Sequence, residues 1–310
     1  MNTIKKLALF LFAAALIASC NKASYKKTPG GMAYQLFKGK DTQRIYPGNF
    51  VMIEFKQKIR DSMYVNTEGK MPLFLQVTPT PQPYDIAELW TSLRVGDSVV
   101  ATQMMDTFIK RSPGGVSPEF KKGDRIITYL KVLAVYPSDS LARAAYEKGQ
   151  KDYLDKEIKT VEKYLADKNI KADKTPSGAF IETVTAGTGN KVDSGNYVSV
   201  NYTGTSWSGK RFDSNTDTAF HHIGPYSFTA GAQQMIKGFD EAVLMMKVGG
   251  SAKVYIPSML GYGANPQSPL IKPYENLIFD LSIVDAKDKA PAPAADPNSR
   301  QMQQPPPPQK

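Results

Sequence analysis

Three side chains that could do chemistry lie close together in the segment VNYTGTSWSGKRFDSN, residues 200 to 215. Two runs of alternating apolar residues flank Ser208-Gly209-Lys210, which is typical of a hairpin turn. The first run carries Tyr202, and the second carries Phe212 and Asp213. Pairing of the two strands would bring two aromatic rings and one carboxylate to the same hairpin, with no nucleophile beside them.

The other polar residues indicate neither a hydrolytic nor a metal centre. The chain has one cysteine, Cys20, which excludes an intramolecular disulfide and a zinc site built from several thiolates. The two histidines, His221 and His222, are adjacent, and on a strand they would point to opposite faces, so we expect them in a surface loop. No arrangement of Ser, His and acid for nucleophilic catalysis is evident. We therefore expect no metal and no cofactor.

Length and charge favour two globular domains over a nucleic-acid-binding protein. The chain has 310 residues, enough for two domains that each bury a core. Its net charge is +10, but the lysines are scattered among acidic residues, and no basic stripe with interleaved aromatic residues occurs. The charge is better explained by a generally basic surface, and we expect no nucleic-acid partner.

The N-terminus has the pattern of a targeting segment. Two lysines precede the apolar run Leu7 to Ala18, which is shorter than the roughly 20 residues that span a bilayer. The run ends in Ile17-Ala18-Ser19-Cys20, which resembles the bacterial lipobox, in which cleavage precedes a cysteine that carries lipid. We expect residues 1–19 to be a lipoprotein signal peptide, although a plain signal peptide with an incidental cysteine is the alternative.

Lipid on Cys20 would anchor the protein to a membrane. The expected location is the cell envelope of a bacterium of the Gram-negative type, in the outer membrane and facing the periplasm.

Four pairs of segments recur in the same order along the chain. KTPGGMAYQLF at Lys27 matches KTPSGAFIETV at Lys174, and PGNFVMIEF ending at Phe55 matches SGNYVSVNY ending at Tyr202. Further along, LRVGDS matches MKVGGS, and IITYLKVL matches LIFDLSIV. An internal repeat with only two copies predicts two closed domains. We assign these domains to residues 20–137 and 175–286.

Within the second copy the hydrophobic pattern is mostly that of strands. NYVSVNY, AKVYI and LIFDLSIV alternate with period two. In MIKGFDEAVLMM, by contrast, Ile236, Phe239, Val243 and Met246 recur at spacings of three and four, which predicts a short helix with one buried face. Strands with a single short helix predict an α+β fold, an antiparallel sheet curled over that helix.

Residues 138–174, between the copies, predict a charged helical linker. Ser138 or Asp139 could cap its start. An apolar stripe at helical spacing could serve self-association, or it could pack against the helix's own domain, and the pattern leaves both open. The stripe consists of Leu154, Ile158, Val161 and Leu165.

Residues 287–310 predict a disordered tail. This segment is rich in proline and has almost no large apolar residues. It cannot bury enough apolar surface to order itself.

The second copy carries the motifs of a known family. VNYTG, GKRFDSN, MIKGFDEAVLMMKVGGSAKVYIP, GYG and LIFDLSIV occur in order through most of residues 175–286. They resemble an FKBP-type peptidyl-prolyl cis-trans isomerase domain. The resemblance implies an antiparallel half-barrel sheet wrapped around the short helix, in two FKBP-like domains joined by the charged linker.

The same resemblance assigns a pocket, position by position. It implies catalytic roles for Tyr202, Asp213, the backbone N–H of Ile236, Tyr262 and Phe279. It also implies a set of apolar and aromatic residues that bind the substrate: Phe212, Tyr226, Phe228, Met235, Phe239, Leu270 and Ile271.

The sequence departs from the family pattern in several places. The loop NTDTAFHHIGPY after Ser214 is longer than in minimal members, and Phe239 stands where the best-studied members have tryptophan. The arginine that often pairs with the family's aspartate has no obvious counterpart, so the sequence gives Asp213 no partner. Gln267 replaces a histidine that some members carry in the flap.

A pocket of this kind can catalyse rotation about an Xaa-Pro bond without a nucleophile. The barrier of roughly 18–20 kcal/mol comes from amide resonance, and the planar amide is more polar than its twisted transition state. An apolar pocket that removes water from the amide therefore favours the twisted form. Phe212, Phe239 and Phe279 could hold the proline ring. The Ile236 N–H and the Tyr262 hydroxyl are the expected donors to the twisted carbonyls.

The first copy lacks these residues. Phe55 replaces the tyrosine of YTG, and Val65 or Asn66 falls at the position of the acid. Thr128 replaces the Phe279 ring, and no GYG precedes it. We expect a retained fold without an isomerase pocket.

The leading hypothesis is a peptidyl-prolyl isomerase that helps envelope proteins to fold and acts on proline-containing, unfolded or partly folded polypeptides. The alternatives are a non-catalytic peptide-binding chaperone and a structural envelope lipoprotein.

Overall fold

The computed structural model describes residues 25–289, and its contacts divide the chain into two compact units, Met1–Gly149 and Gln150–Lys310. The predicted signal peptide, the predicted lipidation site Cys20 and nearly all of the proline-rich tail lie outside the described residues. Among residues 25–289, no helix is both long enough and apolar enough to cross a membrane.

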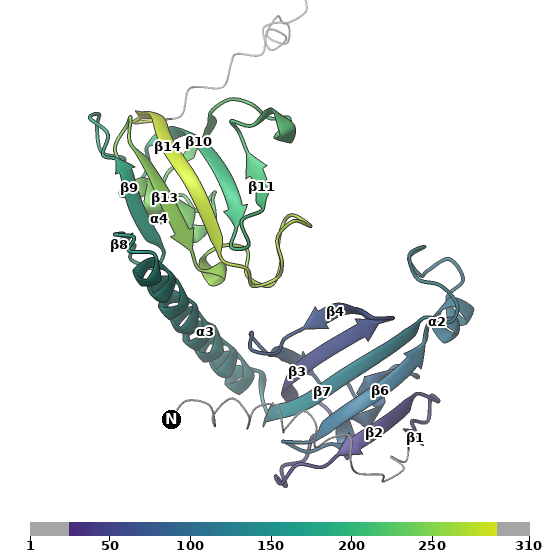
Figure 1. Ribbon diagram of the computed structural model, residues 1–310. Helices are drawn as coiled ribbons and strands as arrows, with labels where there is room; N and C mark the ends of the chain where they lie inside the picture. The colour runs from purple at the N-terminus through teal and green to yellow at the C-terminus, as the bar shows by residue number, and fades with distance from the viewer. Residues whose placement is uncertain (1–24, 290–310) are drawn as a thin grey trace, which may run out of the picture. The chain divides into compact units, whose positions relative to one another are not determined.

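The first unit is built on one seven-stranded antiparallel sheet (Figure 1). The strands follow the spatial order β1-β2-β6-β7-β3-β4, and β5 pairs with β3. A 3₁₀-helix, η1, stands where the repeat places the short helix of the second copy. The elements are β1 (Lys26–Lys27), β2 (Ala33–Phe37), β3 (Phe50–Ile59), β4 (Ser62–Asn66), β5 (Leu73–Gln76), η1 (Ile86–Ser92), β6 (Ser98–Met104), α2 (Met105–Arg111) and β7 (Arg125–Tyr136).

The second unit contains a sheet of the same topology. Its order is β8-β9-β13-β14-β10-β11, and β12 pairs with β10. Replacing each strand by its counterpart in the repeat gives the order of the first sheet, as expected for two copies of one domain. The elements are β8 (Asp173–Lys174), β9 (Phe180–Thr185), β10 (Tyr197–Ser206), β11 (Arg211–Ser214), η2 (Thr218–Phe220), β12 (Tyr226–Thr229), α4 (Lys237–Leu244), β13 (Ser251–Ile256), η3 (Ser258–Leu260) and β14 (Leu277–Lys287).

Helix α4 fills the concave face of the second sheet, behind the strands in Figure 1. Phe239 and Val243 on its buried side are fully inaccessible to solvent. A Cβ atom at Gly238 would lie 2.6 Å from Ile256 Cγ2, so the close approach of helix and strand depends on this glycine. The predicted antiparallel α+β architecture, with one short amphipathic helix in this copy, is confirmed.

The repeated KTP segments have the same structural role in both units. In the first unit the Thr28 hydroxyl donates to Glu88 Oε1 at 2.7 Å, and the Gly30 N–H donates to Oε2 at 2.6 Å. In the second unit the Thr175 hydroxyl donates to Glu241 Oε2 at 2.7 Å. In each unit a carboxylate from the short helical segment is thus held by the start of the domain, which explains why this segment is repeated.

Helix α3 (Asp139–Asp167) contains the division between the two units. Its first part packs on the first sheet, with the Tyr146 ring 5.3 Å from that of Phe74. The apolar stripe of its later part packs against Phe180 and Tyr255 of the second unit. Of the two alternatives that the sequence leaves open, the structure favours packing of the stripe within its own unit. The buried stripe residues are Ile158, Val161 and Leu165.

Candidate functional site

A cluster of aromatic rings lies between the concave face of the second sheet and α4. Phe279 stands at its centre, with its ring centroid 5.2 Å from that of Phe239 and 5.6 Å from that of Phe212, both edge to face. Tyr202 lies 6.2 Å from both Phe239 and Phe279, and Phe228 lies 6.2 Å from Phe239. Because the resemblance assigns these five residues to a pocket, we refer to them as the aromatic pocket.

Strand alternation explains why these rings converge. Tyr202 on β10 and Phe279 on β14 both lie on the concave side, because side chains on a strand alternate between faces. Gly204, the glycine of YTG, pairs directly with Phe279. A Cβ atom on Gly204 would lie 2.5 Å from the Phe212 ring and 2.9 Å from the Phe279 ring. The glycine therefore makes room for both rings, which gives the YTG motif a physical reason.

The rim of the aromatic pocket carries a hydrogen-bonded tyrosine and carboxylate. The Tyr202 hydroxyl donates to Asp213 Oδ2 at 2.7 Å. Burial raises the pKa of Tyr202 well above its usual range, and the hydrogen bond to Asp213 raises it further. The phenol therefore stays protonated and keeps its donor role. The hairpin predicted from the sequence places Tyr202 and Asp213 close together, and the structure brings the two side chains into contact.

The partner that the sequence does not supply for Asp213 is His222. Its Nε2 lies 2.9 Å from Asp213 Oδ1, and its Nδ1 lies 2.7 Å from the backbone oxygen of Phe220. The histidine comes from the long loop after β11 and is half exposed, as a surface loop predicts. Its contact with the carboxylate nevertheless makes it part of the site. The sequence signal was the placement of both histidines in the insertion that directly follows the aspartate.

Asn215 fixes the start of this loop and was also missed by the sequence analysis. Its Oδ1 accepts from the Tyr202 N–H at 2.7 Å, and its Nδ2 donates to the backbone oxygens of Val200 and Gly224, each at 2.9 Å. The amide side chain is almost fully buried. Asn215 therefore ties both ends of the histidine loop to the strand that carries Tyr202.

Two donors expected from the resemblance lie beside the pocket. Ile236 precedes α4 in an extended conformation, and within residues 25–289 its backbone N–H makes no hydrogen bond. The Tyr262 hydroxyl likewise makes none among the described residues, and burial, with a smaller effect of Asp213, raises its pKa. Both groups are thus available as hydrogen-bond donors to a ligand.

The remaining predicted residues take different positions around the pocket. Phe228 and Ile271 are buried in its core, and Met235 and Leu270 pack against that core at the edge. Tyr226 stacks on Phe228 at 6.2 Å but is about half exposed, so it lies at the rim.

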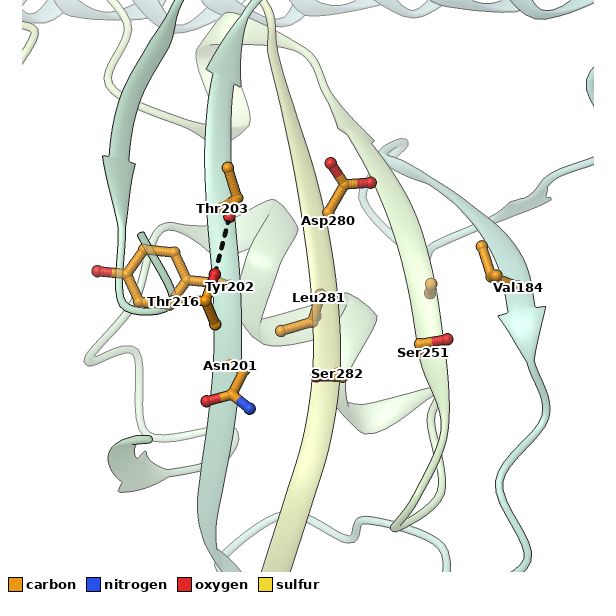
Figure 2. Close-up of a pocket in the computed structure, with 10 residues that line it drawn as sticks. Val184, Asn201, Tyr202, Thr203, Thr216, Ser251, Asp280, Leu281 and Ser282 are labelled. Atoms are coloured by element: carbon orange, nitrogen blue, oxygen red, sulfur yellow. Dashed lines mark hydrogen bonds between the residues drawn. The ribbon is translucent and has the colours of Figure 1, made fainter. Parts of the chain in front are cut away.

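A shallow groove lies on the opposite, outer face of the same sheet, as Figure 2 shows with α4 behind the strands. Its volume is about 300 Å³, and several polar residues line it, among them Asn201, Ser251 and Asp280. The hydroxyls of Thr203 and Thr216 lie 3.4 Å apart across one edge. Of the five residues of the aromatic pocket, Tyr202 alone is among those that line this groove.

In the first sheet a threonine, Thr128, stands at the position of Phe279. Gln57 and Thr128 pair there as Gly204 and Phe279 pair in the second sheet. The Gln57 amide donates to the Thr128 hydroxyl at 3.2 Å, so a polar pair replaces the central ring. Val65 pairs with Gln57, which places it, and not Asn66, at the position of the acid.

Comparisons with known proteins agree with this geometry. The FKBP-type peptidyl-prolyl cis-trans isomerase family matches residues 188–284, within the second unit. An FK506-binding protein of Neisseria meningitidis serogroup B is 38% identical over 107 residues, which are 34% of this chain and 94% of that protein. The chain therefore belongs to the FKBP-type peptidyl-prolyl cis-trans isomerase family, and the resemblance of the second copy to this family is confirmed.

Other similar proteins are longer or are covered only in part. FK506-binding protein 4 of Dictyostelium discoideum is 39% identical over 109 residues, but the match covers 35% of this chain and 28% of that protein. The crystal structure of FkpA from Escherichia coli matches with 32% identity and a TM-score of 0.36, covering 48% of this chain and 65% of that one.

Proposed function

We propose that the second unit catalyses cis-trans isomerisation of Xaa-Pro bonds in unfolded or partly folded polypeptides. The observation that carries this proposal is the hydrogen-bonded pair Tyr202–Asp213, which stands over a floor of rings centred on Phe279. An apolar floor with a polar rim holds a proline ring and leaves the adjoining amide next to hydrogen-bond donors.

Differential binding of the twisted amide is the proposed source of the rate enhancement. The barrier of roughly 18–20 kcal/mol reflects amide resonance, so a site that excludes water weakens the planar, more polar form. The Ile236 N–H and the Tyr262 hydroxyl would donate to the carbonyls as the bond twists. Asp213, held by His222, would keep Tyr202 oriented at the rim. No covalent intermediate is required.

The first unit is proposed to contribute no catalysis. The hydrogen-bonded side chains of Gln57 and Thr128 stand at the positions that Gly204 and Phe279 have in the second unit. In place of the segment that carries Tyr262, this unit has helix α2, which starts at Met105. We assign this unit to docking of partners, to holding unfolded chains or to spacing the catalytic unit.

The proposed site of action is the bacterial cell envelope, with lipid on Cys20 as the anchor. One acyl chain gives only marginal membrane binding, so several chains are expected on this residue. Cys20→Ser should move the protein from the membrane to the soluble envelope fraction. A variant that still sediments with membranes would refute the lipid anchor.

The isomerase proposal is tested by refolding a protein whose slow phase is limited by an Xaa-Pro bond. Catalytic amounts of the full chain should accelerate that phase. Two rival functions predict other results. A non-catalytic chaperone would suppress aggregation without accelerating the proline-limited phase, and a structural lipoprotein would do neither.

A further inference from the structure

One segment carries several of the residues to which the resemblance assigns a role in substrate binding or catalysis. We refer to residues 257–276 as the flap; it contains Tyr262. Ser258, at the start of the flap, is fully buried. Its N–H donates to Asn276 Oδ1 at 2.9 Å, and its carbonyl oxygen accepts from the Gly263 N–H at 2.9 Å. Ser258 therefore joins the two ends of the flap and holds the residue that follows Tyr262.

A carboxylate from α3 holds this same serine. Glu157 is only 6% exposed, and its Oε1 accepts a short hydrogen bond from the Ser258 hydroxyl. Its Oε2 accepts from the Met259 N–H at 3.0 Å. One turn earlier on α3, the Tyr153 ring packs edge to face on Tyr274, 5.3 Å away, near the other end of the flap. Helix α3 thus contacts both ends of the flap.

Docking of the helix does not by itself require this carboxylate. The apolar stripe already packs Ile158, Val161 and Leu165 against the second unit. A buried charge costs free energy unless it is paired and hydrogen-bonded. Both hydrogen bonds of Glu157 go to the first residues of the flap, so their effect is concentrated where the chain leads into Tyr262.

We propose that Glu157 is a positioning residue for isomerisation, which acts by fixing the base of the flap and thereby the Tyr262 hydroxyl over the aromatic pocket. This inference rests on the proposed isomerase function of that pocket. It also makes the later part of α3 a component of the catalytic unit, although the helix reads in the sequence as a linker between domains.

The test compares three variants of the full chain. Glu157→Ala removes both acceptors and should lower kcat/KM for a proline peptide by about fivefold or more, the order expected when a transition-state donor is misplaced. Glu157→Gln should retain most of the activity, because its oxygen can accept from Met259 and its amide can donate to the Ser258 hydroxyl. Ile283→Ala, in the core at the far end of β14, should lower the melting temperature but keep kcat/KM.

Amide hydrogen exchange supplies a second readout that does not depend on activity. The backbone amides of the flap should exchange faster in Glu157→Ala than in the wild-type chain. Their exchange rates should be unchanged in Ile283→Ala. If the wild-type chain has no isomerase activity, the proposed function fails, and the exchange data still decide whether Glu157 orders the flap. The positioning role is overturned if the wild-type chain is active and Glu157→Ala is equally active. It is also overturned if Glu157→Ala and Ile283→Ala lose activity in parallel with their melting temperatures.

Discussion

Replacing Phe279 by alanine tests whether the rings form a binding pocket or only a core. The ring is 4% exposed and lies 5.2–6.2 Å from the rings of Phe239, Phe212 and Tyr202. It faces Gly204 across the strand pair, so no Cβ atom lies there to fill the space left by its removal. The substitution therefore opens a cavity at the centre of the aromatic pocket.

The size of both effects follows from this packing. A buried Phe→Ala substitution lowers the free energy of unfolding by about 3–5 kcal/mol. A domain typically has a free energy of unfolding of about 5–15 kcal/mol, so the variant should remain mostly folded at 25 °C. Burial of one apolar side chain is worth roughly 1.5–3 kcal/mol. If the bound proline ring loses about half of that contact, kcat/KM falls roughly four- to twelvefold, since about 1.4 kcal/mol corresponds to a factor of ten.

The control is Ile283→Ala, on the same strand and the same face of the sheet and 2% exposed. It should cost about 2–5 kcal/mol of stability without touching the rings. Denaturant unfolding gives the stability of each variant, circular dichroism confirms that each is folded, and a proline-peptide assay gives kcat/KM. A Phe279→Ala protein that loses stability but keeps wild-type kcat/KM would show that the ring belongs only to the core.

Other substitutions separate the remaining parts of the account. Tyr262→Phe removes one hydrogen bond worth roughly 0.5–1.5 kcal/mol, so the rate should fall several-fold; complete loss in a folded protein would rule out catalysis by an apolar pocket. His222→Ala leaves the hydrogen bond from the Tyr202 hydroxyl to Asp213 in place, so it should lower kcat/KM less than Asp213→Leu does. A larger loss in His222→Ala than in Asp213→Leu would refute this. Burial raises the pKa of Glu157 above its usual 4.5, although the hydrogen bonds from Ser258 and Met259 oppose this. Because the folded state then binds that proton more tightly than the unfolded chain, stability falls as pH rises through the folded pKa. Melting curves from pH 4 to 7 should show this loss in the wild-type chain and not in Glu157→Gln, and equal slopes would contradict it. A fragment of residues 25–149 should fold but show no isomerase rate above background, and activity in it would mean that the first unit has a site.

The sequence predicts much of the second sheet, because one face of it is buried and the other is not. Alternation in NYVSVNY and LIFDLSIV places Val198, Val200 and Phe279 on the core side, where the structure has them. Alternation gives the wrong exposure for the residues of the sheet that pack against the later part of α3. Phe180 and Tyr255 lie on the outer faces of β9 and β13, which alternation assigns to solvent, so the sequence could not decide what the apolar stripe of α3 contacts.

Contacts made by loops were the least predictable part of the site. The Tyr202–Asp213 pair follows from a hairpin of known spacing, but the approach of His222 depends on how Asn215 folds back the long loop. Glu157 reads as one more charge on a solvated helix face. Its burial depends on Ser258, about a hundred residues later in the chain, and no local pattern reports such a contact.

The most direct measurement of the central claim is exchange between the cis and trans signals of an Xaa-Pro peptide, followed by NMR with substoichiometric amounts of the full chain. Uncatalysed exchange takes tens to hundreds of seconds, so the two sets of signals are separate in the free peptide. The account predicts that the wild-type chain and Ile283→Ala produce exchange between them, and that Phe279→Ala produces roughly a twelfth to a quarter of that rate. Signals that broaden through binding while the cis and trans populations do not exchange would contradict it, and would mean that the aromatic pocket holds proline peptides without isomerising them.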